Sequence, residues 1–85
     1  MTYTYKTQGT CSSSITFDLQ DDVVTNISFT GGCSGNLQGV SILADGLTVE
    51  QIVNKCDGIF CGKKLTSCPD QLAKALIEAK AGRLK

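Results

Sequence analysis

Five cysteines carry most of the reactive chemistry in this 85-residue chain, which contains no histidine. An odd number of cysteines fits a framework of disulfides poorly. The absence of histidine excludes a catalytic triad of the Ser-His-Asp type. It also means that a tetrahedral zinc site must be built from sulfur, with at most a carboxylate such as Asp70. The cysteines are therefore interpreted as metal ligands, redox thiols or small buried side chains.

Cys68 stands where a helix is expected to begin. It is followed by Pro69, and proline is favoured at the first position of a helix. The open N–H groups and the positive dipole end of a helix stabilise an anion such as a thiolate, the form that binds a metal or attacks a disulfide. In the alternative interpretation, Ser67 and Asp70 form an ordinary capping box and Cys68 is incidental.

Two other cysteines lie in polar turns. Cys11 is in GTCSSS, between two expected strands, and Cys33 is in GGCSGN, directly before an expected helix. Cys61, in the loop sequence DGIFCGKK, is either a ligand or a bystander, whereas Cys56 lies on an apolar helix stripe and is interpreted as a core thiol. No C-x-x-C motif occurs. The candidate ligands for zinc or an iron–sulfur cluster are Cys11, Cys33, Cys68 and Cys61.

The bulk composition argues against several classes of function. Eight basic and eight acidic residues give a net charge of zero, so no electrostatic field attracts nucleic acid or a membrane surface. No apolar stretch approaches the roughly 20 residues that span a bilayer, and MTYTYKTQGT lacks the features of a secretory signal. We expect a cytoplasmic protein with reduced thiols. It is expected to form one domain, residues 1–85, too small for a catalytic barrel.

The first third of the chain predicts strands. Polar and apolar residues alternate in TYTYKTQ, in ITFDLQ and in VVTNISFT, and Asp21 and Asp22 form a tight turn between the last two segments. In the third segment one row on the apolar face is expected to consist of Val23, Thr25, Ile27 and Phe29. The three strands predict an antiparallel meander with one apolar face that requires a cover.

Helices are expected to provide that cover. Asn36 is a candidate cap for LQGVSILADG, Thr48-Val-Glu-Gln51 is a capping box, and a last helix opens at 67–69. Gly58 and Gly82 are the expected stops of the second and last helices. The apolar stripes of these two helices consist of Val49, Ile52, Val53, Cys56, Leu72, Ala75, Leu76 and Ala79. The prediction is an α+β fold, a three-stranded antiparallel meander followed by two to three helices on one face.

TSCPDQLAKAL, from Thr66 to Leu76, resembles the signature of the TSCPD domain family, and FTGGCSGNLQGVS and LADGLTVEQI are similar to that family as well. The resemblance covers nearly the whole chain and implies a small bacterial protein. The same domain occurs at the tail of adenosylcobalamin-dependent ribonucleotide reductases, so the resemblance also implies an association with ribonucleoside-diphosphate reductase.

The order of elements also resembles the iron–sulfur scaffolds of the NifU N-terminal and IscU type. Those scaffolds carry ligand cysteines after the first strand, after the third strand and at the start of a late helix, which are the places of Cys11, Cys33 and Cys68. The resemblance implies that these thiols meet at one end of the sheet. Ser13 and Ser67 replace an aspartate and a histidine of the scaffold, so a fourth ligand would come from Cys61, Asp70, water or a partner.

Three functions follow from these observations. The first is a metal-binding module that holds zinc or an iron–sulfur cluster and works with a protein partner such as a metal-delivery protein. The second is an accessory thiol protein, in which Cys61 and Cys68 pass reducing equivalents to a ribonucleotide reductase. The third is a structural interaction domain with buried, reduced cysteines. The glycine-rich TGGCSGN before a helix is a weaker indication of an anion site.

Overall fold

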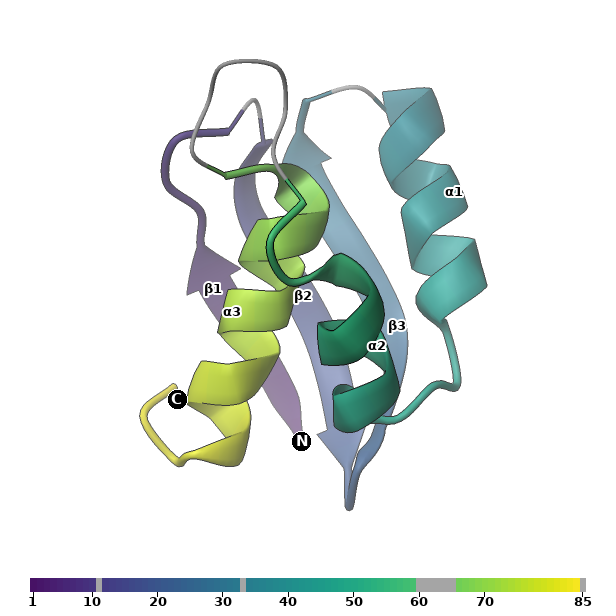
Figure 1. Cartoon of the computed structure of the whole chain (residues 1–85), viewed down its shortest axis with the longest axis vertical. Helices are drawn as coiled ribbons and strands as arrows, with labels where there is room; N and C mark the ends of the chain where they lie inside the picture. Colours follow the sequence, from purple (N-terminus) through teal and green to yellow (C-terminus); the bar gives the residue numbers. More distant parts are fainter. Residues whose placement is uncertain (11, 33, 60–65, 85) are drawn as a thin grey trace.

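The computed structural model describes residues 1–10, 12–32, 34–59 and 66–84. Three strands are followed by three helices, and the helices lie on one face of the sheet (Figure 1). The elements are β1 (Thr2–Lys6), β2 (Ser12–Gln20), β3 (Val23–Gly31), α1 (Ser34–Ala44), α2 (Val49–Cys56) and α3 (Cys68–Lys80). The predicted α+β architecture is confirmed.

The sheet is an antiparallel meander in the order β1-β2-β3. Tyr3 pairs with Phe17, and Ile15 pairs with Phe29, so aromatic and β-branched side chains share the face that the helices cover. The turn between β2 and β3 contains Asp21 at a φ of 55°, a left-handed conformation that aspartate tolerates better than most residues. The apolar side chains of the first two strands therefore lie on one face of the sheet, as predicted.

The predicted apolar row of β3, Val23, Thr25, Ile27 and Phe29, is wrong for its first two residues. Thr16 pairs with Ser28 but Asp18 pairs with Thr25, so β3 contains one residue more than β2 across this step. Asn26 occupies the bulge with a φ of 54°. Because an extra residue reverses which side chains face inward, Val24 is fully buried, whereas Val23 before it is 40% exposed. Thr25 lies on the same side of the bulge as Val24, so it is likewise displaced from the row of Ile27 and Phe29.

The bulge is held by side chains on both sides. The Asn26 side-chain amide donates to Asp18 Oδ2 at 2.8 Å, and the Asn26 backbone N–H donates to Asp45 Oδ1 at 3.0 Å. Hydrogen bonds from Thr2 and Asn26 hold the pKa of Asp18 below its ordinary value. An asparagine in this position thus connects the bulge to β2 and to the turn after α1.

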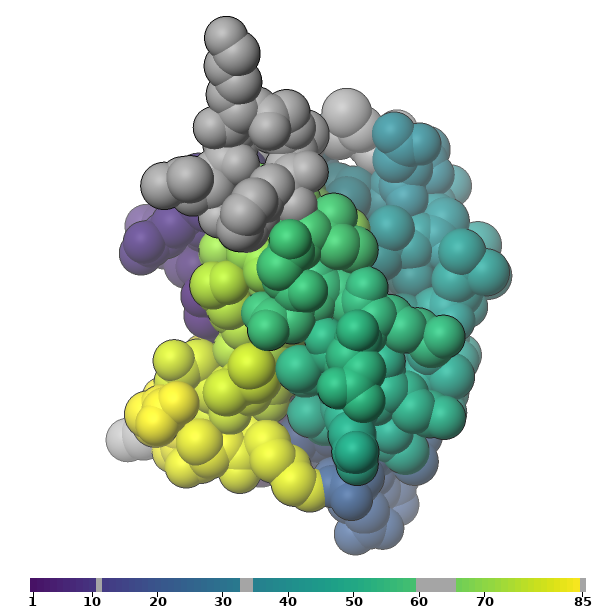
Figure 2. All heavy atoms as spheres, in the orientation of Figure 1, coloured from purple at the N-terminus to yellow at the C-terminus, as the bar shows by residue number. Residues whose placement is uncertain are grey.

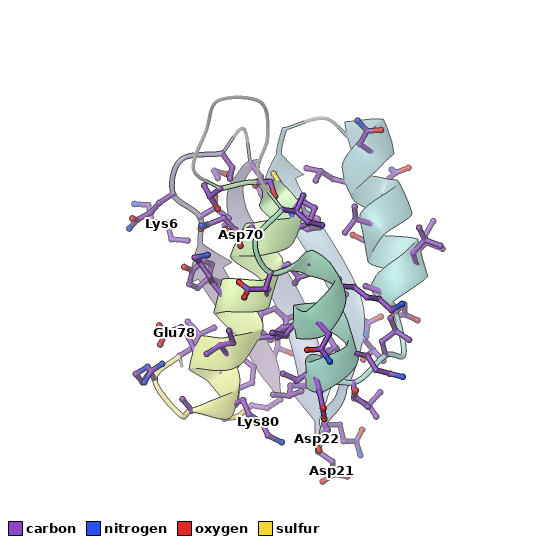
Figure 3. All side chains as sticks on the ribbon, in the orientation of Figure 1. Lys6, Asp21, Asp22, Asp70, Glu78 and Lys80 are labelled. Carbon is purple, nitrogen blue, oxygen red and sulfur yellow. The ribbon has the colours of Figure 1, made fainter. Side chains whose placement is uncertain are left out.

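The helices bury the apolar face of the sheet, and together they hide most of the strands in the space-filling view (Figure 2). α2 and α3 pack against each other, α3 against β2, and α1 against β3. The core residues are Ile15, Phe17, Val24, Ile27, Ala44, Val49, Ile52, Leu72, Ala75, Leu76 and Ala79. At its C-terminal end α3 is joined to the β2–β3 turn by an ion pair between Lys80 and Asp22 (Figure 3). Within the described ranges, no helix has the length and apolar character that crossing a membrane requires.

α1 begins earlier than predicted. It starts at Ser34, so Asn36 lies inside the helix and is not its cap. Leu37 is buried, but Ile42 and Leu43 are 74% and 81% exposed. α1 is therefore less completely covered than the other two helices.

The predicted capping box of α2 is confirmed. The Thr48 hydroxyl accepts from the N–H of Gln51 at 3.2 Å, and the Gln51 side chain accepts from the N–H of Thr48 at 2.9 Å. Gly58, with a φ of 84°, follows the Asp57 cap at the other end, as expected. Both ends of this helix are thus specified by local sequence.

Thr48→Ala is expected to lower the free energy of unfolding by about 1 kcal/mol, because it removes the acceptor for the open N–H of Gln51. Urea unfolding followed by circular dichroism measures the change. Asn54→Ala, at an exposed position of the same helix, is the matched control and should cause no loss. Equal stabilities for Thr48→Ala and the wild type would contradict the role of the cap.

Candidate functional site

The candidate site lies at the N-terminal end of α3, where the sequence reads Thr66-Ser-Cys-Pro-Asp70. Ser67 is the cap in an extended conformation, and its hydroxyl accepts from the N–H of Asp70 at 3.1 Å. The same hydroxyl donates to the carbonyl oxygen of Ile59 at 2.5 Å. Pro69 is in the first turn, where its missing N–H costs nothing. The predicted start of the last helix is confirmed, and Cys68 is its first residue.

Cys68 is buried and faces the beginning of β2. Its side chain is 6% exposed, and its Sγ lies 3.2 Å from the hydroxyl oxygen of Ser12. Ser12 is itself buried, and its carbonyl oxygen accepts from the hydroxyl groups of Thr7 and Thr10. The sulfur thus contacts a buried hydroxyl group, whose residue is held in place by two further hydroxyl groups.

Ser12 links three chain segments. Ser12, at the start of β2, is the register partner of Gly31, at the end of β3, and it contacts Cys68 at the start of α3. In the sequence, Cys11 directly precedes Ser12, and Cys33 is two positions after Gly31. Cys68 and the described residues nearest in sequence to Cys11 and Cys33 are therefore neighbours at one end of the sheet.

The structure describes only one of the four predicted ligands. Cys68 is described, whereas Cys11, Cys33 and Cys61 lie outside the described residues. No group of three potential ligands occurs among the described side chains, a set that excludes those three thiols. The expected convergence of the four sulfurs stays a prediction.

Asp70 has a structural role that its sequence position alone did not indicate. Its carboxylate is completely buried, and it accepts from the backbone N–H of Gly58 at 2.8 Å, from the Thr66 hydroxyl at 2.5 Å and from the Lys74 ammonium at 2.7 Å. The carboxylate does not return to the N–H of Ser67, so the reciprocal half of the expected capping box is absent. With its oxygens occupied by these donors, Asp70 is a poor candidate for the fourth metal ligand.

These contacts explain the charge state of Asp70. Burial raises the pKa of the carboxyl, but the hydrogen bonds from Lys74, Thr66 and Gly58, together with the charge of Lys74, outweigh that effect and lower the pKa to about 2. The same hydrogen bond to Asp70 raises the pKa of Lys74. The pair is therefore ionised at neutral pH and fixes the chain after α2 to the start of α3.

Gln71 is a second buried polar residue that sequence reasoning missed. Its side-chain oxygen accepts from the N–H of Gln8 at 3.0 Å, and its side-chain amide donates to the Thr66 hydroxyl at 3.0 Å. Gln8 is 63 positions away in the chain. No local pattern signals such a contact, because glutamine on a helix is usually exposed. Gln71 connects the β1–β2 connection to the candidate site.

Cys56 is the other described cysteine, and it lies in a different environment. It is half-buried at the end of α2, next to a cavity of about 210 Å³ whose other lining residues include Val40, Leu47 and Ile59. Burial raises the pKa of its thiol, and the charge of Lys55 offsets this only in part. The interpretation of Cys56 as a packing residue fits this environment better than a reactive role does.

The part of the chain that builds this site matches the model of a known protein family. The family model of the TSCPD domain matches residues 1–80, which include all three strands, all three helices and Thr66–Asp70. No curated protein and no solved structure matches the chain, and the similarity to iron–sulfur scaffolds stays a prediction. Because the match extends over nearly the whole chain, the protein belongs to the TSCPD domain family.

Proposed function

We propose that Cys11, Cys33, Cys61 and Cys68 bind a metal, either zinc or an iron–sulfur cluster, at the N-terminal end of α3. The observation that carries the proposal is the contact between Ser12 and the Cys68 sulfur, together with the pairing of Ser12 with Gly31. It makes the chain neighbours of Cys11 and Cys33 neighbours of Cys68. Four thiolates are the ligand set of structural zinc sites and of common iron–sulfur clusters.

The environment of Cys68 suits a metal-bound sulfur. A hydroxyl group within hydrogen-bonding distance, here that of Ser12, offsets the negative charge of a thiolate ligand. The position at the first residue of α3 adds the favourable dipole of the helix. Ser12 is therefore assigned the role of orienting and stabilising the Cys68 sulfur.

The burial of Cys68 argues against the thiol-redox alternative. A thiol that exchanges disulfides with a larger reductase must be accessible to its partner. Cys68 is 6% exposed, so it is poorly placed for direct attack. A metal ligand requires no such access, and we favour the metal-binding module with a protein partner that supplies or receives the metal.

Elemental analysis of protein purified without oxygen tests the proposal. We expect about one zinc ion or one cluster per chain, a cluster being recognised by its visible absorbance. Cys68→Ala, Cys11→Ala, Cys33→Ala and Cys61→Ala should each lose most of the metal, because a ligand is missing. Cys56→Ala is the matched control, since Cys56 lies beside an apolar cavity, and it should keep the wild-type content.

Two results would contradict metal binding. One is metal-free wild-type protein in which the thiols react independently with a thiol reagent. The other is equal metal content in Cys68→Ala and Cys56→Ala, with circular dichroism spectra showing both variants folded. Unreactive thiols in metal-free protein would instead support the structural interaction domain.

A further inference from the structure

The outer edge of β3 is closed along its first half by the chain itself. The N–H of Val24 donates to the carbonyl oxygen of Leu47 at 2.9 Å, and the carbonyl oxygen of Val24 accepts from Gly46 at 2.7 Å. Asn26 follows, and its N–H donates to Asp45 Oδ1. The turn after α1 thus pairs with this half of the edge much as a fourth strand would.

The second half of the same edge has open backbone groups at Phe29. Leu19 exchanges backbone hydrogen bonds with Met1, so the odd-numbered residues of β2 in this register direct their N–H and C=O groups towards β1. Ile15, opposite Phe29, is one of them. The N–H and C=O of Phe29 therefore point away from β2. Among the described residues outside the sheet, none bonds to either group.

A groove runs along this open part of the edge. It has a volume of about 350 Å³ and lies between β3 and α1, with Ile27, Phe29, Leu37 and Ile42 among its lining residues. α1 lies beyond the edge of the sheet, with no strand of the described chain beneath its outer side (Figure 1). Ile42 is 74% exposed. A strand added to β3 would lie below α1 and cover Ile42.

The sequence of this edge lacks the usual protection against strand addition. Natural edge strands carry lysine, proline or inward-pointing charges that discourage pairing. β1, at the opposite edge of the sheet, has the exposed Lys6. Residues 27–32 read ISFTGG and contain no charge and no proline. The unprotected stretch coincides with the open backbone and the apolar groove.

We propose that the groove between β3 and α1 binds an extended segment of a partner polypeptide, which pairs with Phe29 as a fourth strand. The segment alternates apolar side chains, placed under Ile42 and against Leu37, with polar ones on the open face of the sheet, where Ser28 and Thr30 are exposed. The lining residues of the groove carry no charge, so its apolar positions select against charged side chains.

A second copy of this chain does not fit the same place. Pairing two β3 strands would put them about 5 Å apart, and each would bring its own overhanging α1 to the same face. Helices with side chains are about 10 Å wide, so both helices would compete for the space above the new strand pair. A single extended segment without a helix of its own avoids this clash.

Peptides are first selected from a random decapeptide phage library on the full chain. A selected peptide is then synthesised and titrated against the wild type and the variants Ile42→Lys and Leu43→Lys. Ile42→Lys should weaken its binding about tenfold or more, because it places a charge over the apolar segment. Leu43→Lys is the matched control, since Leu43 is equally exposed but lines the cavity beside α2, and it should bind like the wild type. Amide hydrogen exchange should show that the peptide protects the N–H of Phe29.

Three outcomes would overturn the proposal. In the first, no peptide with alternating apolar residues is enriched. In the second, a selected peptide is weakened by Leu43→Lys and not by Ile42→Lys, which places it beside α2. In the third, sedimentation shows a wild-type dimer that Ile42→Lys dissociates, which identifies a second copy as the occupant. Circular dichroism of both variants checks that neither change unfolds the chain.

Discussion

Asp70→Ala is expected to lower the free energy of unfolding by about 3 to 5 kcal/mol, because the hydrogen bonds to a buried, charged carboxylate are lost and their donors are left unpaired. The carboxylate is fully buried and accepts from Gly58, Thr66 and Lys74. Its loss leaves the Gly58 N–H and the Thr66 hydroxyl without their acceptor. A domain of this size has a total stability of about 5 to 15 kcal/mol, so the variant should be close to unfolding. Urea unfolding at neutral pH measures the change.

Lys74→Met removes the ion pair but keeps the carboxylate, so it tests the contribution of the ion pair alone. The lysine side chain is 46% exposed, and partly exposed pairs contribute little, so a loss of about 1 kcal/mol or less is expected. The carboxylate keeps its bonds from Gly58 and Thr66 in this variant. Similar losses for Asp70→Ala and Lys74→Met would show that the ion pair and not the hydrogen-bond network determines stability.

The same carboxylate predicts a pH dependence of stability. Its pKa is about 2 in the folded protein against an ordinary value of 3.8, so the unfolded chain binds the proton first as pH falls. The contribution, about 2 kcal/mol, is complete above pH 3.8 and is lost progressively towards pH 2. Asp70→Asn should remove this part of the acid dependence. Parallel stability curves for the wild type and Asp70→Asn between these pH values would contradict the assignment.

Phe17→Ala is expected to cost a similar amount, about 3 to 5 kcal/mol, because it opens a cavity in the core. The ring is completely buried at the centre of β2 and stacks on Tyr3 with centroids 5.7 Å apart. Both the transfer of the ring from water and its packing contacts are lost. Urea unfolding with the same protocol measures the effect.

Two substitutions control this measurement. Phe17→Leu keeps most of the apolar volume and should cost less than the alanine variant. Ser28→Ala, at an exposed position of β3, should stay within about 0.5 kcal/mol of the wild type. A small loss in Phe17→Ala, comparable to that in Ser28→Ala, would mean that the ring is not part of a packed core.

The local sequence was sufficient to predict most of the fold. Alternation in the first two strands, the capping box at Thr48 and the stop at Gly58 depend on residues within a few positions of one another, and the structure has all of them. The start of α3 at Ser67 and Cys68 was predicted for the same reason. These features follow from backbone geometry and nearby hydrogen bonds.

The misplaced row of β3 shows the limit of that reasoning. Alternation was read as uninterrupted from Val23 to Phe29, but Asn26 forms a bulge supported by Asp18 and Asp45. Those two residues are 8 and 19 positions away. A bulge depends on its partner strand and neighbouring turn, so the pattern of one strand does not reveal it.

The amino-acid sequence by itself determined the family, the three strands, both ends of α2, the start of α3 and the set of cysteines that could act as ligands. Only the tertiary structure decided that Asp70 is a buried acceptor, that Ser12 contacts the Cys68 sulfur across 56 positions, and that no described residue outside the sheet bonds to the backbone of Phe29 below α1. The physical reason is that turns, caps and periodicity are governed by neighbours in the chain. Burial and site geometry are governed by residues that become neighbours only when the chain folds.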